Sequence, residues 1–148
     1  MMALGRLAYF LLRPFLRLYL ARTTRVYGLI TSEGQVLAVK NWLGRQAWSL
    51  PGGGVRPSES SRLALCREIK EETSLSINPK QLRPLSQGRW QTDNLGFKYI
   101  VMQAEISRIE PVRRQWPEVV TAGWITPAQL TKAGDVELIT TLKLANLI

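Results

Sequence analysis

The sequence predicts a domain of the α/β class, in which helices cover both faces of a mixed β-sheet. Three observations support this prediction. Residues 48–75 have the pattern of a short strand, a glycine-rich turn and an acidic helix in immediate succession. Apolar segments of strand length lie on both sides of this unit. Two segments with a helical pattern lie between residues 127 and 148. With 148 residues, 45% of them hydrophobic, the chain is long enough to bury a core.

The strands before the helix follow from alternation and turn residues. Two strands are predicted at 25–31 and 36–40, because residues 32–34 (Ser-Glu-Gly) suit a hairpin turn between them. Residues 48–51 have the pattern of the end of a short strand. The three glycines at 52–54 then let the backbone turn sharply and come close to a ligand.

The elements after the acidic helix follow in the same way. Further strands are predicted at 82–91, 97–106 and 119–125. Residues 93–96 (Asp-Asn-Leu-Gly) predict a second hairpin between the first two of them. A short helix is expected after Pro127, and a final helix from Val136 with Asp135 as its N-cap.

The helix after the glycine turn carries a cluster of glutamates. Glu68, Glu71 and Glu72 stand at i, i+3 and i+4 and therefore share one face. Like charges at this spacing destabilise a helix by about 0.2–0.5 kcal/mol per pair. A hard divalent cation is the simplest group that offsets this repulsion, because Mg²⁺ takes oxygen ligands and is shared between carboxylates and substrate phosphates. The pattern predicts a metal site.

The opposite side of this helix is expected to pack inward. Its apolar positions are Leu63, Cys66, Ile69 and Thr73. Ser58 is the expected N-cap, because its hydroxyl can accept from an early backbone N–H.

Residues 53–75 resemble the signature of the Nudix hydrolases, G-x5-E-x7-R-E-U-x-E-E-x-G-U, where U is apolar. The defining positions are filled by Gly53, Glu59, Arg67, Glu68, Ile69, Glu71, Glu72 and Leu75. Only the second glycine differs, being Ser74. This position favours a left-handed residue at the helix end, so serine there costs a C-cap and no carboxylate.

The resemblance covers residues 26–130 and implies an α/β/α sandwich. It also implies Mg²⁺ or Mn²⁺ as cofactor and attack by water at a phosphorus of a diphosphate linked to a nucleoside. We expect Glu68, Glu71 and Glu72 to be metal ligands, with Glu68 or Glu72 also polarising the water. Glu59 is expected as an auxiliary ligand, and Gly53 as the close backbone approach to the same metal.

The general base is expected to be a carboxylate, because the chain contains no histidine. This absence excludes Ser-His-Asp triads and histidine-based zinc sites. Outside the motif the best candidate is Glu118, which directly precedes the strand predicted at 119–125. The alternative function is a nucleotide-binding or membrane-associated sensor module of the same fold that does not turn substrate over.

The substrate is expected to be a small nucleoside diphosphate-type molecule, and nucleic acid is not expected. Side chains that could meet its phosphates are Lys40, Arg56, Arg67 and Arg89. The fork of Arg67 can also hold a carboxylate by a bidentate pair. Aromatic residues that could contact the leaving moiety are Trp42, Trp90, Tyr99 and Trp116, each of which also suits a core position. The net charge of +9 suits any anionic partner and discriminates little.

Residues 1–24 are expected to form a basic, amphipathic helical segment ahead of the domain at 25–148. The segment is rich in Leu, Phe and Tyr and contains no acid, and Arg6, Arg13 and Arg17 lie within about 40° on a helical wheel. These arginines disfavour a membrane span, and Pro14 is expected to break or kink the helix. Three roles fit: packing on the domain or in a homodimer, peripheral membrane binding, and organelle targeting. The single cysteine fits a reducing compartment, and we expect a cytoplasmic protein.

Overall fold

The computed structural model describes residues 23–42, 47–92, 95–113 and 119–148. Within them the strands are β1 (Thr24–Ser32), β2 (Gln35–Asn41), β3 (Gly52–Gly54), β4 (Arg83–Thr92), β5 (Leu95–Glu105) and β6 (Val119–Ile125). The helices are α2 (Ser61–Thr73), a 3-10 turn (Pro79–Gln81), α3 (Pro127–Ala133) and α4 (Val136–Leu144).

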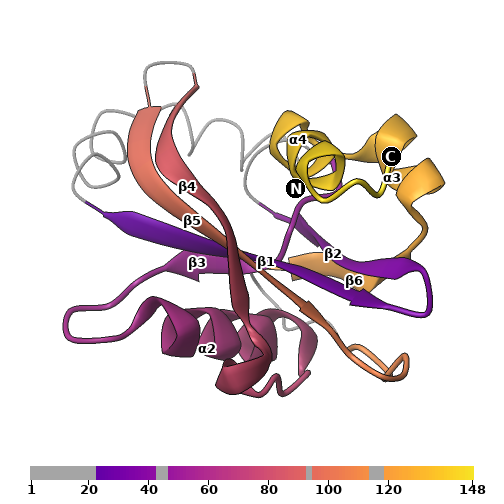
Figure 1. Ribbon diagram of the computed structural model, residues 1–148, viewed down its shortest axis with the longest axis horizontal. Coiled ribbons are helices and arrows are strands. Elements are labelled where there is room, and N and C mark those ends of the chain that lie inside the picture. Colours follow the sequence, from indigo (N-terminus) through magenta and orange to yellow (C-terminus); the bar gives the residue numbers. More distant parts are fainter. Residues whose placement is uncertain (1–22, 43–46, 93–94, 114–118) are drawn as a thin grey trace.

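The six described strands form one mixed sheet (Figure 1). Its order is β4-β5-β1-β2-β6, and β3 pairs with β1 beside this path. β1 and β5 run parallel from Thr24 opposite Lys98 to Thr31 opposite Glu105. The other pairs are antiparallel. β1 is therefore the central strand, with β5 on one side and both β3 and β2 on the other.

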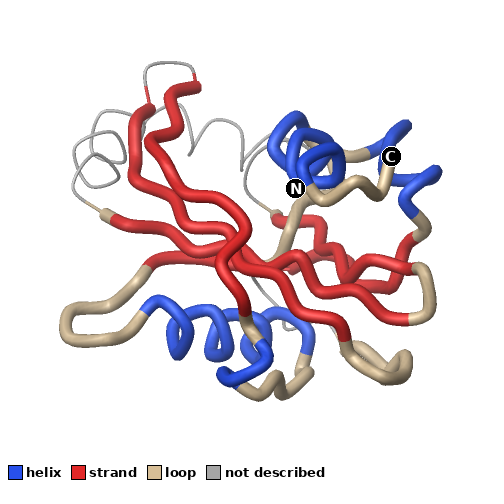
Figure 2. The backbone as a smooth tube through the Cα atoms, viewed as in Figure 1, coloured by secondary structure: helices blue, strands red, loops and turns tan. Residues whose placement is uncertain are grey.

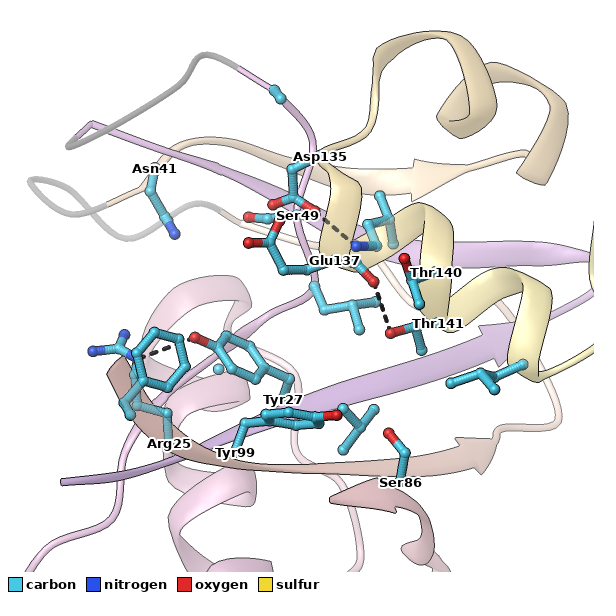
Figure 3. A pocket seen from close by; sticks show the side chains of 17 residues that line it. Arg25, Tyr27, Asn41, Ser49, Ser86, Tyr99, Asp135, Glu137, Thr140 and Thr141 are labelled. Atoms are coloured by element: carbon cyan, nitrogen blue, oxygen red, sulfur yellow. Dashed lines mark hydrogen bonds between the residues drawn. The ribbon is translucent and has the colours of Figure 1, made fainter. Parts of the chain in front are cut away.

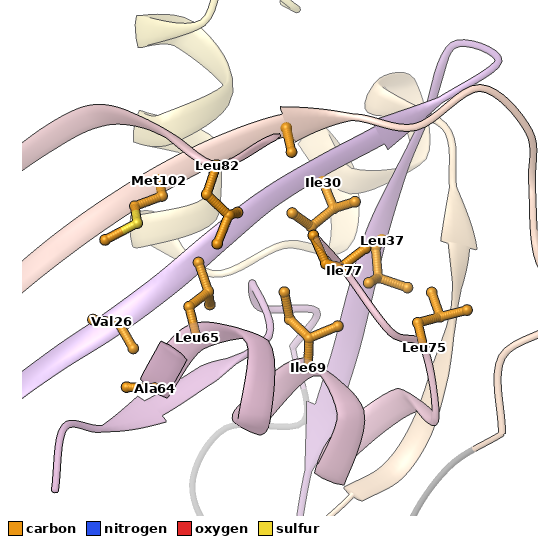
Figure 4. Packing of buried hydrophobic residues seen from close by; sticks show 11 residues of the cluster. Val26, Ile30, Leu37, Ala64, Leu65, Ile69, Leu75, Ile77, Leu82 and Met102 are labelled. Carbon is orange, nitrogen blue, oxygen red and sulfur yellow. The ribbon is translucent and has the colours of Figure 1, made fainter. Parts of the chain in front are cut away.

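Helices cover both faces of the sheet (Figure 2), which confirms the predicted layering. Alternation along β1 sends Val26 and Ile30 toward α2 and Leu29 toward α3 and α4. Gly28 lies under α2, where a Cβ atom would come within 3.2 Å of Leu65 and Ile69. Figure 4 shows the core on the α2 side, built from Val26, Ile30, Leu37, Ala64, Leu65, Ile69, Leu75, Ile77, Leu82, Met102 and Ala104. A second core lies beneath α3 and α4 and contains Leu29, Val36, Ala38, Leu50, Val101, Leu130, Leu138 and Leu142.

Both predicted hairpins are present. In the first, Ser32 pairs with Gln35, and the two residues between them have positive φ values of 49° at Glu33 and 74° at Gly34. In the second, the last pair of β4 and β5 joins residues 92 and 95, and the turn at 93–94 lies outside the described residues. Two positive φ angles in a two-residue loop match the twist of the flanking strands, which explains why Gly34 suits the first turn.

The ends of the helices confirm one prediction and correct two. Asp135 caps α4, since its Oδ1 accepts from the Leu138 N–H at 2.7 Å. Ser74 keeps the left-handed conformation of a C-cap, with φ 65° and ψ 2°, and its backbone N–H donates to the Lys70 carbonyl oxygen, so the expected loss of the cap does not occur. The N-cap of α2, however, is Ser60 and not Ser58. Ser58 has φ 63° and lies in the preceding turn, where it cannot adopt the extended conformation of an N-cap.

The glycine segment and the buried face of α2 also differ from expectation. Gly52–Gly54 form strand β3 beside β1, with Val26 opposite Gly53, and do not form a turn. Leu63, expected to face inward, is 54% exposed. Ile69 and Thr73 are buried as expected, but the buried face is centred on Leu65, Ile69 and Glu72, which stand at i, i+4 and i+7. The helix is thus rotated so that one of its glutamates enters the protein.

Residues 1–22 lie outside the described part, so the amphipathic segment and the division at residue 24 stay predictions. Among the described residues, no helix is both long enough and apolar enough to cross a membrane.

The close approach of β3 to β1 makes Gly52 a sensitive position. A Cβ atom there would overlap the Val26 carbonyl oxygen and lie 2.9 Å from the Tyr27 Cα, whereas a Cβ at Gly54 meets nothing within 4 Å. We expect Gly52→Ala to lower the free energy of unfolding by about 3 kcal/mol, the upper part of the range for overpacking. Gly54→Ala is the matched control and should change it by less than about 1 kcal/mol. Urea unfolding measures both, and equal effects would contradict the packing described.

Candidate active site

The carboxylates of α2 meet β3 where the strand has no side chains. A Cβ atom at Gly53 would overlap the Glu68 carboxylate, so only glycine leaves room for it. One turn further along α2, Glu72 is 6% exposed, and its Oε2 accepts from the Gly52 N–H at 2.9 Å. A buried carboxylate is stable only when it is hydrogen-bonded or paired. The missing side chain at Gly53 thus makes room for Glu68, and the backbone N–H of Gly52 holds Glu72.

Arg67 joins three of the glutamates and the backbone of β3. Its Nε and Nη2 atoms donate to Glu59 Oε1 and Oε2, both at 2.9 Å. Its Nη1 donates to Glu68 Oε1 at 2.8 Å and to Glu71 Oε2 at 3.2 Å. Nη2 also donates to the Gly54 carbonyl oxygen at 2.9 Å. The predicted bidentate hold on a carboxylate is confirmed, with Glu59 as its partner.

The same contacts set the protonation of this network. The hydrogen bonds from Arg67 lower the pKa of Glu59 from 4.5 to about 2, and a hydrogen bond from the Arg56 N–H adds to the effect. The Glu59 and Glu68 carboxylates in turn raise the pKa of Arg67. At neutral pH Glu59 is therefore ionised and Arg67 is charged, so the two form an ion pair.

The other predicted site residues have separate surroundings. Glu71 is at its edge, with a side chain 47% exposed that contacts Arg56 at 3.4 Å. The Lys40 ammonium lies 4.9 Å from the centre of the Trp48 ring. Arg89 is exposed on β4, opposite Lys98. Glu118 lies outside the described residues. Roles for Lys40, Arg56, Arg67 and Arg89 in substrate binding stay predictions.

A pocket of about 320 Å³ opens on the other face of the sheet, between β1, β5 and α4 (Figure 3). Its aromatic lining consists of Tyr27, Phe97 and Tyr99, and its polar lining includes Arg25, Asn41, Asp135 and Glu137. Leu50 and Gly52 also line it, so the pocket reaches β3, whose next residue contacts Glu68. The acidic cluster and the pocket thus share one strand.

Most pocket residues were not predicted as site residues. Tyr99 was a candidate, and Asp135 was assigned only as a helix cap. The available signal was Arg25 and Tyr27, which are two residues apart and therefore share one face of a predicted strand. This signal gains meaning only once β5 is known to pair with β1, which sets Arg25 opposite Tyr99.

Comparison with known proteins is consistent with this arrangement. The sequence model of a protein family, the NUDIX domain, matches residues 20–142. The chain belongs to the Nudix family.

Two curated relatives of this Nudix protein are informative. An RNA pyrophosphohydrolase of Teredinibacter turnerae is 37% identical over 83 residues, which are 56% of this chain and 44% of that protein. The chain thus matches less than half the length of this relative. Phosphatase NudJ of Shigella boydii is 24% identical over 110 residues, which cover 73% of this chain and 71% of NudJ.

A solved structure shares the fold. The NUDIX domain of Shewanella oneidensis NrtR, complexed with ADP ribose, superposes with a TM-score of 0.75. The two chains are 17% identical over 85% of this chain and 87% of that one.

Nudix hydrolases generally use divalent metals, and the donors in this chain fit one in kind. Among the residues that the structure describes, no three His, Cys, Asp or Glu side chains are grouped as ligands of one ion. Mg²⁺ does not need such a cage, because it is commonly held by one or two carboxylates, waters and substrate phosphates. Glu68 and Glu72, set side by side against Gly52 and Gly53, provide that minimum of hard oxygen donors.

The low pKa of Glu59 predicts a dependence of stability on pH. Below about pH 4.5 the unfolded chain protonates Glu59, whereas the folded Nudix domain does so only near pH 2. The stability that Glu59 contributes is complete above this window and is lost as pH falls through it. Glu59→Gln should therefore be less stable at pH 7 and show a shallower loss of stability between pH 4.5 and 2.

Urea midpoints measured at several pH values test this expectation. Glu105→Gln is the control, because Glu105 is an exposed residue at the end of β5, away from Arg67. It should retain the wild-type slope. If Glu59→Gln also retained that slope, the ion pair with Arg67 would not control this carboxylate.

Proposed function

We propose that this chain hydrolyses the diphosphate linkage of a nucleoside diphosphate-linked compound and depends on Mg²⁺ or Mn²⁺. The observation that carries the proposal is the placement of Glu68 and Glu72 against the side-chain-free strand β3. The family supports the reaction class, and one curated relative is named as a pyrophosphohydrolase and another as a phosphatase.

The metal would be held by Glu68 and Glu72 beside Gly53, with Glu71 at the exposed edge and Glu59 as an auxiliary ligand. A bound divalent cation neutralises phosphoryl oxygens and lowers the pKa of the water that attacks phosphorus. Glu59 supports this arrangement through Arg67, because Arg67 is hydrogen-bonded to Glu59, Glu68 and the Gly54 carbonyl at once.

In the proposed reaction a water oxygen forms a bond to one phosphorus, and the bond from that phosphorus to the bridging oxygen breaks. The water gives its proton to a carboxylate, and the bridging oxygen leaves on the second phosphate. Glu68, Glu71 and Glu72 are the described candidates for the base, and Glu118 stays a fourth. No histidine competes for this role, since the chain has none.

The moiety that carries the diphosphate is proposed to enter the pocket beneath α4. The pocket reaches Gly52, and Gly52 donates to Glu72, so a ligand there would have its phosphates next to the acidic cluster. Arg25 is the arginine that lines this pocket, with its guanidinium 5.8 Å from the centre of the Phe97 ring. A positive charge at this position suits the anionic part of such a ligand.

The substitution Glu68→Gln tests the proposal, because it removes the negative charge and hardly changes the size of the side chain. The amide cannot act as an anionic ligand, so kcat/KM should fall by at least about a hundredfold. The assay is release of phosphate or nucleotide from a panel of nucleoside diphosphate compounds with Mg²⁺ or Mn²⁺. Circular dichroism establishes that the variant is folded.

Glu105→Gln is the matched control and should keep wild-type activity. Full activity in Glu68→Gln would contradict the assignment of this residue. Stabilisation of the wild-type protein by these compounds without any product would instead support a binding module that does not turn substrate over.

A further inference from the structure

The floor of the pocket is a flat aromatic surface. Gly88 on β4 is opposite Tyr99 on β5, and a Cβ atom there would lie 3.0–3.2 Å from Oη, Cζ and Cε1 of Tyr99. The tyrosine ring therefore lies across the neighbouring strand, over a residue without a side chain. Figure 3 shows Tyr99 among the side chains that line the pocket. A ring in this position presents one face to the pocket, and such a face suits stacking of a planar heterocycle.

The roof of the pocket carries hydrogen-bond acceptors. Glu137 lies in the first turn of α4 and lines the pocket, and no described residue forms a side-chain hydrogen bond or ion pair with its carboxylate. Asp135 precedes it and fixes the start of α4 through its cap. The pocket of this basic protein thus has an acceptor-rich side.

The carboxylates face the aromatic wall across the pocket. Burial is the main cause that raises the pKa of Tyr27, and the negative charges of Glu137 and Asp135 raise it further, against the effect of Arg25. Arg25 Nε donates to the Tyr27 hydroxyl at 3.1 Å, so the arginine and the carboxylates lie on different sides of the phenol (Figure 3). A ligand on Tyr99 therefore has a cationic side near Arg25 and an acceptor side near Glu137.

This arrangement discriminates among planar nucleobases by their N–H groups. A carboxylate needs two donors side by side for a bidentate contact. The guanine edge offers N1–H and the exocyclic amino group next to each other. Adenine sets its amino group beside a ring acceptor, and uracil sets its single N–H between two carbonyl oxygens, which a carboxylate would repel. An acceptor-rich roof therefore favours guanine.

We propose that the pocket binds the base of the substrate, with the base stacked on Tyr99, and that Glu137 makes the site selective for guanine. This proposal rests on the proposed function only in treating the ligand as a nucleotide. Glu137 is a specificity-determining residue in this account and takes no part in the attack on phosphorus.

Binding of nucleoside monophosphates to the full chain tests the proposal, because these compounds contain no diphosphate bond to cleave. Calorimetry with guanosine, inosine and adenosine 5′-monophosphates compares three bases, of which inosine lacks only the 2-amino group. We expect guanosine monophosphate to bind at least about tenfold more tightly than the other two, since a lost hydrogen bond to a charged group has about this effect. Equal affinities for the three would overturn the proposal.

Three variants locate the source of selectivity. Glu137→Gln should bind guanosine and inosine monophosphates equally, whereas Glu105→Gln should keep the wild-type preference. Tyr99→Leu should weaken all three nucleotides by a similar factor, because stacking does not depend on the amino group. An unchanged preference in folded Glu137→Gln would overturn the role of this residue.

The outcomes also separate this proposal from the proposed function. Selective binding of guanosine monophosphate by a protein that hydrolyses nothing would support the pocket and contradict the hydrolase. Hydrolysis of guanine, adenine and uracil compounds at equal kcat/KM would support the hydrolase and overturn the selectivity.

Discussion

The site depends on the close contact between α2 and a strand that has no side chains. Gly52 and Gly53 allow Glu72 and Glu68 to reach the backbone of β3, and β3 in turn pairs with the central strand β1. A buried carboxylate needs a donor, and the Gly52 N–H supplies one. The contact therefore couples the packing of α2 to the position of its acids. A side chain at Gly53 would displace the Glu68 carboxylate of α2, and one at Gly52 would push β3 away from β1.

Charge balance is the second constraint on the same helix. The spacing of the glutamates implies repulsion, for which a metal ion is one solution. The structure contains another, because Arg67 is hydrogen-bonded to Glu59, Glu68 and Glu71. Glu72 does not share this partner and is stabilised by the strand. The arginine thus holds these three side chains in place and offsets part of their repulsion, so a cation would find its ligands already positioned.

Local patterns predicted much of this structure. The hairpin at Glu33 and Gly34 and the cap at Asp135 follow from the preferences of single residues and were found as expected. Ser74 was expected to cost the C-cap of α2, yet it adopts the left-handed conformation that glycine prefers. The rotation of α2 about its axis could not be predicted from the preferences of single residues. Leu63 and Leu65 suit a buried position equally well by composition, and only the packing of Leu65 against Gly28 distinguishes them. Ser58 and Ser60 are likewise equivalent caps until the backbone of the preceding turn is known.

The pocket could not be predicted, because it is built by parallel pairing between strands that are far apart in the sequence. Tyr27 and Tyr99 meet only when β1 and β5 align, and Glu137 joins them from the last helix. The metal site proposed at Glu68 and Glu72 lies on the other face of β3. It is tested most directly by calorimetric titration of the folded chain with Mn²⁺, with and without a nonhydrolysable nucleoside diphosphate analogue. The account predicts saturable binding that the analogue strengthens and that Glu68→Gln weakens by at least about tenfold. Absence of saturable binding under both conditions, or equal binding by Glu68→Gln, would contradict it.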